Sequence, residues 1–457
     1  MQEKELFQVQ KSYFSTGETL DIKRRLICLL RLKKEIQARE QKIMDALSAD
    51  FGKCPFDTYT TEILMVLDEI NAFVRHLKHW SRPRRASAGL INFPSAGRIY
   101  SQPFGCVLVI SPWNYPFMLA LSPLVGAIAA GNCVVLKPSS QTPHTTAVLA
   151  ELVESAFQPG HAAVVTGGHD QSDRLLELPF DFIFFTGSPS VGKKVMAKAA
   201  EHLTPVVLEL GGKSPCIIDR TADLETAAKR IVWGKFVNAG QTCVAPDYLL
   251  ADRRITALLL ENIKREITAF YYRDGRLSQD YPRIINAKHF ERLSNLLSCG
   301  EVFCGGELYP EENRIAPTVL VGVSPDSAVM QEEIFGPVLP VLEVERIEEA
   351  IDFVNSRPKP LALYCFTASK QVMRQVLKNT SSGGGCINDT VMHVSSERLP
   401  FGGVGASGMG RYHGKASFET FSHFRSILHK PVRMEMRVKY PPHDGNKIKR
   451  VKKLLHK

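Results

Sequence analysis

Five short, continuous apolar segments follow one another between residues 106 and 208 and constrain the fold more than any other feature. Helix-compatible stretches, such as 143–157 and 191–202, separate them. A strand that is apolar on both faces must be covered on both sides, as it is in a parallel sheet between helices. The repeated units therefore predict a doubly wound, Rossmann-like α/β domain that binds a nucleotide. The five segments are 106–110, 133–136, 162–166, 182–185 and 206–208.

The rest of the chain adds N-terminal helices and a second α/β region. The length of 457 residues fits two or three domains. The first 80 residues show helical spacing of apolar side chains, and the Pro and Gly residues of 83–103 are typical of a hairpin. The later segments predict helices over 224–239, 255–270 and 346–355, strands over 338–344 and 361–366, and a Gly-rich segment over 400–414.

The net charge of +10 is concentrated in the C-terminal tail. Residues 425–457 hold 11 Lys or Arg against two acidic residues, a net of +9, so the first 424 residues carry only +1. A nucleic-acid partner is therefore not expected for the body of the chain. Ten cysteines without a C-x-x-C pair predict no disulfide framework and no metal site, and they indicate a reducing, cytoplasmic location.

The sequence contains neither a membrane-spanning apolar stretch nor a signal peptide. The stretch 99–136 has no charged side chain, but four prolines interrupt it, and a lipid-exposed helix would leave backbone groups unpaired at those breaks. The first residues lack the basic start and apolar run of a signal peptide. We therefore expect no transmembrane segment.

Glycine and polar residues gather where the predicted strands end. Residues 186–192 form a glycine-containing turn from a strand into a helix, and a helix N-terminus favours phosphate. An ordinary tight turn is the alternative interpretation of this segment. Asn114 follows the strand at 106–110 and can direct its amide at a developing oxyanion, or it can serve as a structural turn residue.

Two further residues have the chemistry of a covalent catalyst. Cys243 lies in a loop after a predicted helix, where a thiol can act as a nucleophile if a base takes its proton. Most cysteines, however, are buried hydrophobic residues. Glu209 ends an apolar strand, and burial would raise the pKa of its carboxyl group toward that of a general base. The alternative is a structural glutamate that caps a turn or pairs with Lys213.

Seven motifs in a fixed order resemble those of the aldehyde dehydrogenase superfamily, over about residues 1–430. The short N-terminus and the run at 408–414 resemble its class 3, or fatty aldehyde, branch. The motifs are SPWNYP at 111–116, KPS at 137–139, FTGS at 185–188, LELGGKS at 208–214, FVNAGQTC at 236–243, EEIFGP at 332–337 and PFGG at 400–403.

The resemblance implies an aldehyde dehydrogenase fold: a doubly wound, Rossmann-like cofactor domain, a second α/β catalytic domain, and a small oligomerisation hairpin with an arm. The implied boundaries are 1–82 and 104–208 for the cofactor domain, 83–103 and 415–432 for the hairpin and arm, 209–398 for the catalytic domain, 399–414 for a Gly-rich return to the cofactor domain, and 433–457 for the basic tail.

The resemblance also implies NAD(P)-dependent oxidation of medium or long aliphatic, or aromatic, aldehydes to carboxylic acids. Cys243 would form a thiohemiacetal and then a thioester, Asn114 and the Cys243 backbone N–H would hold the oxyanion, and Glu209 would activate water. No metal is implied. The other implied positions are Trp113, Lys137, Ser140, Gly187, Ser188, Gly192, Glu333 and Phe335 for NAD or NADP, and Tyr115 and Leu119 for the substrate.

Three other functions compete with this one. A CoA-acylating relative would use the same cysteine without a water-activating glutamate, so Glu209 argues for hydrolysis. A reductive semialdehyde enzyme would need a phosphate or acidic-substrate pocket, which the sequence does not indicate. A non-catalytic scaffold could bind nucleic acid or lipid through its tail, but Cys243, Glu209 and Asn114 weigh against it.

Three finer expectations complete the analysis. Ser140 stands where many relatives carry a glutamate that would repel a 2′-phosphate, so we expect NADP to be accepted as well as NAD. The resemblance implies a homodimer that forms through 83–103 and 418–431. Within 446–457, four apolar residues share a helical face among basic ones, which would suit weak contact with an anionic membrane surface; the alternative is a solvated end or a flap over the substrate entrance. These four residues are Ile448, Val451, Leu454 and Leu455.

Overall fold

The computed structural model describes residues 2–89, 92–434 and 439–455. Of residues 454 and 455 it describes the backbone only. Its first α/β domain is built on a six-stranded sheet of order β19-β7-β6-β3-β4-β5. All neighbours are parallel except β19, which runs antiparallel to β7. The order reverses beside β3, which is the topology of a doubly wound sheet. The strands are β3 (Cys106–Ile110), β4 (Cys133–Lys137), β5 (Ala162–Val164), β6 (Phe182–Gly187), β7 (Val206–Leu210) and β19 (Gly408–Met409).

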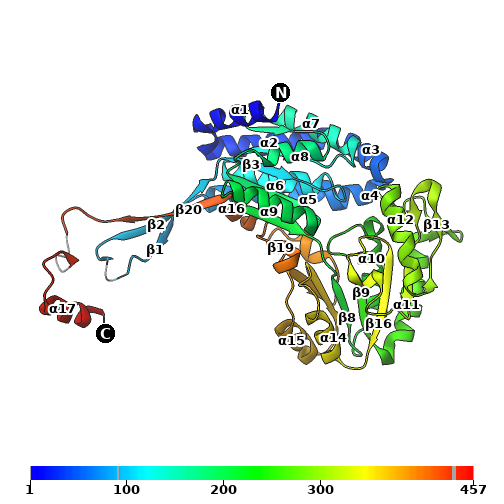
Figure 1. Cartoon of the computed structure of the whole chain (residues 1–457). Coiled ribbons are helices and arrows are strands. Elements are labelled where there is room, and N and C mark those ends of the chain that lie inside the picture. Colours follow the sequence, from blue (N-terminus) through cyan, green and yellow to red (C-terminus); the bar gives the residue numbers. More distant parts are fainter. Residues whose placement is uncertain (1, 90–91, 435–438, 456–457) are drawn as a thin grey trace.

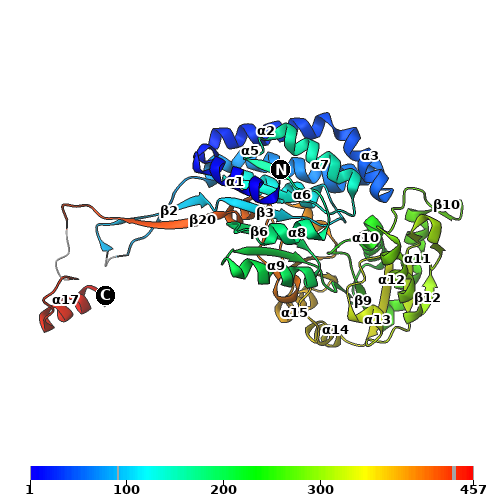
Figure 2. The ribbon, with the colours of Figure 1, turned by 45° about the horizontal axis from the view of Figure 1, so that its top comes forward.

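Helices cover both faces of this sheet (Figures 1 and 2). The helix between β3 and β4, α6 (Met118–Ala130), is apolar all round and buried along almost its whole length, as expected for a helix enclosed by other elements. A short π-helical turn, Tyr59–Ile63, joins α4 to α5. The other helices of the domain are α1 (Glu3–Ser15), α2 (Ile22–Ala38), α3 (Glu40–Phe51), α4 (Pro55–Thr58), α5 (Leu64–Trp80), α7 (Pro143–Ala156), α8 (His169–Leu176), α9 (Pro189–Glu201) and α16 (Lys415–Thr420).

The second α/β domain has a seven-stranded sheet of order β12-β15-β16-β9-β8-β17-β18. Only β12 is antiparallel to its neighbour. Its strands are β8 (Pro215–Ile218), β9 (Tyr248–Asp252), β12 (Glu301–Cys304), β15 (Thr318–Val321), β16 (Val338–Val344), β17 (Ala362–Phe366) and β18 (Gly384–Ile387). Its helices are α10 (Leu224–Phe236), α11 (Arg253–Tyr271), α12 (Ala287–Leu296), α13 (Ala328–Gln331), α14 (Ile347–Asn355) and α15 (Lys370–Asn379). Two small hairpins pair β10 (Tyr272–Arg273) with β11 (Arg276–Leu277), and β13 (Leu308–Tyr309) with β14 (Arg314–Ile315).

A three-stranded antiparallel sheet projects from the first domain (Figure 1). It consists of β1 (Arg84–Ala86), β2 (Ala96–Pro103) and β20 (Ser422–His429). β2 and β20 pair in continuous register from Ala96 with His429 to Pro103 with Ser422. Beyond β20 lies the tail helix α17 (Gly445–Leu455), away from both α/β domains. Among the described residues, no helix combines the length and apolar character needed to cross a membrane.

The structure refines two of the expected boundaries. β7 continues to Leu210, two residues beyond the boundary expected after residue 208, so Glu209 belongs to the first sheet. α16 packs on α6, where a side chain at Gly126 would meet Ser417 and Phe421, so the projecting arm begins at Ser422. The short strand β19 bonds to β7 and returns the Gly-rich segment to the first domain.

Candidate active site

The sequence-predicted residues of the first domain gather at one edge of its sheet. Parallel strands place their carboxyl ends together, and ligands of doubly wound proteins bind where the strand order reverses. Asn114 lies in the loop between β3 and α6, and Lys137 is the last residue of β4. Gly187 ends β6, and Glu209 is the penultimate residue of β7. The fold thus brings four distant segments to a single edge.

Cys243 reaches this edge on a loop of the second domain. The loop follows α10 and a tight turn, Val237–Gly240, in which Asn238 and Ala239 adopt positive φ. Gly240 has a φ of +72°, and a Cβ at this position would overlap the carbonyl oxygen of Gly336. Only glycine fits such a position without strain. The close approach holds the Cys243 loop against the loop that carries Glu333.

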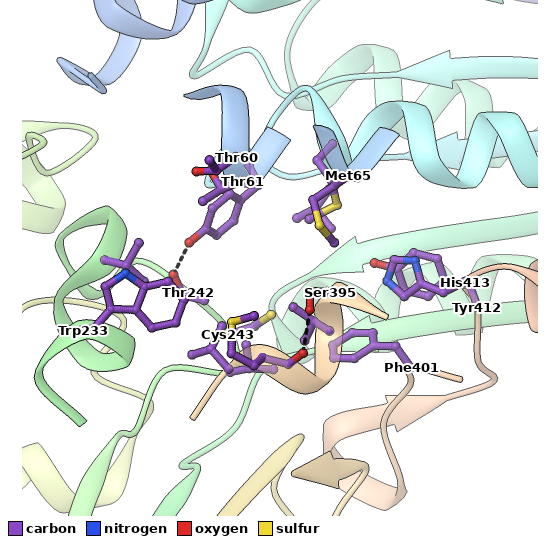
Figure 3. Close-up of a pocket in the computed structure, with 18 residues that line it drawn as sticks. Thr60, Thr61, Met65, Trp233, Thr242, Cys243, Ser395, Phe401, Tyr412 and His413 are labelled. Carbon is purple, nitrogen blue, oxygen red and sulfur yellow. Dashed lines mark hydrogen bonds between the residues drawn. The ribbon is translucent and has the colours of Figure 1, made fainter. Parts of the chain in front are cut away.

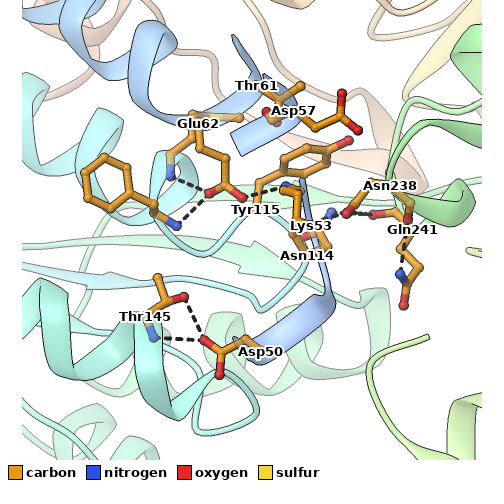
Figure 4. A network of polar contacts seen from close by, with 12 residues as sticks. Asp50, Lys53, Asp57, Thr61, Glu62, Asn114, Tyr115, Thr145, Asn238 and Gln241 are labelled. Atoms are coloured by element: carbon orange, nitrogen blue, oxygen red, sulfur yellow. Dashed lines mark hydrogen bonds and ion pairs between the residues drawn. The ribbon is translucent and has the colours of Figure 1, made fainter. Parts of the chain in front are cut away.

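Hydrogen bonds connect the Asn114 loop to the Cys243 loop (Figure 4). The Asn114 side-chain amide donates to the Gln241 carbonyl oxygen at 3.0 Å. In return, the Asn238 amide donates to the Asn114 carbonyl oxygen at 2.8 Å. An NH₂ group has two hydrogens, so Asn114 keeps one for another acceptor. The amide is therefore fixed two residues from Cys243.

An apolar cavity of about 220 Å³ opens onto Cys243 (Figure 3). Tyr115 and Leu119, both expected at the substrate, are among its lining residues. The loops, helices and turns that contribute the wall come from both α/β domains. The other lining residues are Thr60, Thr61, Met65, Met118, Trp233, Val237, Thr242, Val244, Val391, Met392, Val394, Ser395, Phe401, Tyr412 and His413.

Glu209 is a buried carboxylate that has no hydrogen-bond partner in the described part of the chain. It is 3 % exposed, and among the described residues neither carboxylate oxygen finds a hydrogen bond. Burial raises the pKa of this carboxyl group well above its usual range. The alternative of a Glu209–Lys213 pair is wrong, because the Lys213 ammonium bonds to Asp247 and to the Val329 and Glu332 carbonyl oxygens.

Burial also raises the pKa of the Cys243 thiol above its usual range. The neighbouring carboxylates of Glu333 and Glu209 act in the same direction, since negative charge disfavours a thiolate. Cys243 is half-buried at the cavity wall, so it is accessible to a ligand in the cavity. Its chemistry therefore depends on a base that removes the thiol proton.

The residues expected at the phosphates and ribose lie at and beyond the carboxyl ends of β4 and β6. The Ser188 hydroxyl caps α9 by accepting from the Val191 N–H at 3.5 Å, and Gly192 lies buried in the first turn. The Lys137 ammonium donates to the Pro138 and Gly167 carbonyl oxygens, both at 2.8 Å, which leaves a third N–H. A 13-residue helix whose N-terminus points to this edge and a fixed ammonium suit a dinucleotide.

The residues expected at the nicotinamide end lie on the opposite loop. A Cβ at Gly211 would overlap the Glu333 carboxylate, so a larger residue there would displace the Glu333 side chain. Burial and Asp247 raise the pKa of Glu333 to about 8. The Phe335 ring, on a residue with positive φ, meets the Trp113 ring edge-on with centroids 5.4 Å apart. Ser140 is exposed in the turn after β4. These placements fit the cofactor implied by the sequence.

Sequence reasoning missed several buried polar residues of the site. Lys53 and Glu62 form a buried ion pair beside Tyr115 (Figure 4). The Lys235 ammonium is fully buried, and no described residue offers it a hydrogen bond. Lys213 and Asp247 form a second charged pair, and the Asp247 carboxylate also accepts from the Ile334 N–H at 3.0 Å. A charged residue beside an apolar run was an available signal for Lys235 and Glu62.

A doubly wound domain, a second α/β domain and a cysteine loop at a common edge suit an oxidoreductase with a nucleotide cofactor. The chain belongs to the aldehyde dehydrogenase family, whose model matches residues 3–427. Members of this family are NAD(P)-dependent enzymes that oxidise aldehydes, and the chain is such an enzyme. Relatives from aldehyde dehydrogenase family 3 confirm the resemblance of the chain to the class 3 branch.

The chain is similar along nearly its whole length to known relatives. It is 46 % identical to the 4,4′-diaponeurosporen-aldehyde dehydrogenase of Staphylococcus aureus, over 98 % of this chain and 97 % of the relative. It is 48 % identical to human aldehyde dehydrogenase family 3 member B1, over 95 % and 94 % of the two chains. A solved structure of substrate-bound Staphylococcus aureus AldH superposes with a TM-score of 0.96 at 45 % identity, covering 98 % of both chains.

More distant structures bear on the cofactor. A glyceraldehyde-3-phosphate dehydrogenase from Methanocaldococcus jannaschii, solved with NADP, superposes with a TM-score of 0.85 at 26 % identity, covering 94 % of both chains. An indole-3-acetaldehyde dehydrogenase solved with NAD+ superposes at 0.86 and 26 % identity, covering 94 % of this chain and 89 % of its own. The expectation of NAD and/or NADP as cofactor is confirmed at this level.

Proposed function

We propose that the enzyme oxidises medium or long aliphatic, or aromatic, aldehydes to carboxylic acids through a thioester on Cys243. One observation carries this proposal: Cys243 lines an apolar cavity while its loop is hydrogen-bonded to Asn114. An aldehyde with an apolar tail would bury that tail in the cavity and place its carbonyl at the thiol. The relative named for 4,4′-diaponeurosporen-aldehyde supports an apolar substrate.

In the first step, the Cys243 thiol gives its proton to the neighbouring Glu209 carboxylate, which releases it to solvent before the last step, and the sulfur attacks the aldehyde carbon. A C–S bond forms, and the carbonyl π electrons move to oxygen, giving a thiohemiacetal oxyanion. The free N–H of the Asn114 amide and the Cys243 backbone N–H would hold this oxyanion. Asn114 suits the role because its other N–H is already fixed on Gln241.

The first domain would hold the cofactor, with Lys137 at the adenosine ribose and Gly187, Ser188 and Gly192 at the pyrophosphate. Glu333 and Phe335 would contact the nicotinamide ribose end, with Trp113 lining the same cleft. The chemistry that NAD(P) supplies when bound is acceptance of the hydride from the aldehyde carbon. Cys243 then carries the acyl group as a thioester.

In the last step, Glu209 removes a proton from water while the water oxygen attacks the thioester carbon. The C–S bond breaks, Cys243 leaves as a thiolate, and the carboxylic acid departs. A raised carboxyl pKa suits this role, because the group takes up a proton more readily than an exposed glutamate does. Glu209 has no partner among the described residues that would compete for its lone pairs.

The experiment is NAD(P)H formation with hexanal or benzaldehyde, with the acid measured as product. We expect stoichiometric acid and NAD(P)H from the purified enzyme. Addition of CoA distinguishes the acylating alternative, because acyl-CoA would then replace the acid. Absence of NAD(P)H formation with apolar aldehydes of every length would contradict the proposal.

We also propose a homodimer formed through the projecting sheet. β20 is an edge strand of this sheet, and β18 is an edge strand of the sheet in the second domain. Edge strands carry unpaired backbone N–H and C=O groups, which can bond to a strand of another subunit. Leu428 on β20 is 51 % exposed, which suits an interface. Light scattering at micromolar protein should give twice the chain mass, and a monomer would overturn the assignment.

The location and the tail complete the proposal. Ten unpaired cysteines support a cytoplasmic enzyme. The exposed helix α17 bears basic residues and an exposed Ile448, which supports weak contact with an anionic membrane surface; the Leu454 and Leu455 side chains lie outside the described residues. Co-sedimentation with anionic liposomes at low salt should be lost when 446–457 are deleted, and no sedimentation would favour a solvated tail.

A further inference from the structure

The buried ion pair of Lys53 and Glu62 has no role in the chemistry above. The ammonium nitrogen lies 2.6 Å from a carboxylate oxygen, and the side chains are 1 % and 0 % exposed. Burying two charges is costly, and an apolar pair of similar size is often as stable. The pair therefore calls for an explanation other than stability, and its remaining contacts supply one.

Glu62 holds the end of the Asn114 loop. Its second carboxylate oxygen accepts hydrogen bonds from the Phe117 N–H at 2.9 Å and the Met118 N–H at 3.2 Å. These N–H groups lie where the loop after β3 enters α6, and the first N–H groups of a helix lack intrahelical partners. A carboxylate there is favoured by the helix dipole as well. Glu62 thus fixes the segment that follows Asn114 and Tyr115.

Lys53 holds the middle of the same loop. Its ammonium lies 4.4 Å from the centroid of the Tyr115 ring, within cation–π range. The Tyr115 hydroxyl is 2.7 Å from the Thr242 hydroxyl, next to Cys243. Figure 4 shows Lys53 between Glu62 and the tyrosine ring. A continuous set of contacts therefore runs from the ion pair to the residue before the nucleophile.

The π-helical turn explains how Glu62 reaches this position. π-helical turns are rare in proteins and often mark functional sites. Within Tyr59–Ile63, Thr60 and Thr61 line the apolar cavity, whereas Glu62 is buried beneath the loop. One turn thus contributes both a cavity wall and the carboxylate that fixes the oxyanion loop.

We propose that Lys53 and Glu62 are positioning residues for aldehyde oxidation, which hold Asn114 and Tyr115 in register with the Cys243 loop. The inference rests on the proposed thioester mechanism. The pair touches neither the substrate cavity nor Cys243, so it acts only through the loop. Its loss should lower kcat and leave the KM for NAD unchanged, because the contacts of the cofactor-binding edge do not include it.

The test is a double-mutant cycle with Asn114→Ala. Lys53→Met and Glu62→Gln should each lower kcat by about tenfold or more in the otherwise unchanged enzyme, since a displaced oxyanion donor is lost as effectively as a deleted one. On the Asn114→Ala background the same changes should alter kcat by less than about twofold, because the residue they position is gone. A general loss of structure would instead lower kcat by the same factor in both backgrounds.

Arg25→Met is the matched control. Arg25 is another buried cation of the first domain, and its guanidinium bonds to the Thr19 carbonyl and, at 3.3 Å, to the Ala129 carbonyl near the other end of α6. We expect this variant to lower Tm and leave kcat unchanged. If Lys53→Met or Glu62→Gln fails to fold, Lys53→Met/Glu62→Leu removes both charges together and should fold with lowered kcat.

The outcomes separate this inference from the mechanism on which it rests. Cys243→Ser with normal turnover would overturn the thioester mechanism itself. An inactive Cys243→Ser enzyme, together with wild-type kcat for Lys53→Met and Glu62→Gln, would overturn the positioning role alone. Equal effects of these two changes in the presence and absence of Asn114 would likewise contradict it.

Discussion

Two groups of buried polar residues lie around the active site, and they differ in whether their side chains have hydrogen-bond partners. In the positioning network, which consists of Lys53, Glu62, Asn114 and Tyr115, each side chain has an ion-pair or hydrogen-bond partner. In the unpaired group, Glu209 and Lys235 have side-chain polar atoms for which the described residues provide no hydrogen bond. Since an unpaired buried polar group costs free energy, its retention points to ligands or chemistry rather than to stability.

This contrast yields opposite expectations for the two groups. Removing a member of the positioning network should lower both stability and activity, because the partner is left buried and unpaired. Removing a member of the unpaired group should lower activity or ligand binding while it leaves stability equal or higher. The predictions below test this division, in order of decreasing effect.

The largest effect is expected for Cys243→Ala. Without the sulfur no thioester can form, so kcat should fall by at least about a thousandfold. The cavity loses one small group, and Tm and the Kd for NAD, measured by fluorescence titration, should stay close to wild type. Cys299→Ala, which removes another half-buried thiol of the second domain, is the control and should retain activity. More than a thousandth of wild-type kcat in Cys243→Ala would identify a different nucleophile.

Glu209→Gln should slow thioester hydrolysis by about a hundredfold while it spares hydride transfer. A stopped-flow burst of NAD(P)H should therefore appear before a slow steady state. Because burial raises the pKa of Glu209, the loss of wild-type kcat at low pH should begin above the usual carboxyl range. That low-pH loss should be absent from Glu209→Gln.

The same variant separates the two groups by stability. Glu209→Gln replaces an unpaired buried carboxylate by a neutral amide, so Tm should hold or rise. Glu62→Gln is the counterpart in the positioning network and should lower Tm, because the buried Lys53 side chain loses its carboxylate partner. A lower Tm in Glu209→Gln than in Glu62→Gln would remove the distinction between the groups.

Lys235→Met tests the unpaired group by stability alone. Burial lowers the pKa of Lys235 from 10.5 to about 8, so below pH 8 the folded protein carries a buried ammonium at a cost of about 3 kcal/mol. Between pH 8 and 10.5 the unfolded wild-type chain binds more protons at Lys235 than the folded chain does. The free energy of unfolding of the wild type therefore rises with pH relative to that of Lys235→Met. The advantage of Lys235→Met in chemical denaturation should therefore be largest near pH 7 and smallest near pH 10.5.

An unchanged difference across that pH range would show that the Lys235 ammonium does not titrate with folding. Lys264→Met, on the exposed side of α11, provides the matched control for loss of a lysine charge. Its effect on stability should be small at every pH, because exposed charges are well solvated.

The sequence predicts the sheets better than it predicts the polar networks. The segments at 106–110 and 338–344 have the same bounds as β3 and β16, because uninterrupted apolar runs between turn residues permit little else. The shorter strands β8 and β18 were not predicted, since four-residue segments with Pro or Gly carry little periodicity. Local pattern thus determines the long elements, and packing between elements determines the rest.

The same limit applies to the site. Cys243, Glu209 and Asn114 stand in motifs at strand or helix ends, where their chemistry is visible from neighbouring residues. The Lys53–Glu62 pair depends on a π-helical turn and on bonds to residues 117 and 118, more than fifty positions away. No local spacing in the sequence encodes such a contact. Only the folded structure shows that Lys53 and Glu62 contact the loop that carries Asn114.

The smallest expected effect concerns the choice between NAD and NADP at the far end of the cofactor edge. Ser140 is exposed after β4, close in sequence to Lys137, and it offers a hydroxyl where an acid would repel a 2′-phosphate. The acid that the structure places near this turn, Asp50, is already committed to the N-terminus of α7. Its carboxylate accepts from the Thr145 N–H at 2.8 Å and from the Thr145 hydroxyl at 2.7 Å (Figure 4).

Because Asp50 is engaged in this way, we expect both cofactors to support turnover. Ser140→Glu should lower kcat/KM for NADP by about tenfold more than for NAD, since a charge-assisted bond to phosphate is replaced by repulsion. Ser139→Ala, which removes the neighbouring hydroxyl, is the control and should change both values alike. A wild-type preference for NAD of more than about a hundredfold, or 2.7 kcal/mol, would show that another group excludes the phosphate. The size of the Ser140→Glu effect measures how far one exposed charge alters the selectivity between NAD and NADP. The other groups expected to contact the cofactor, Lys137 and the N-terminus of α9, are the same in both enzymes.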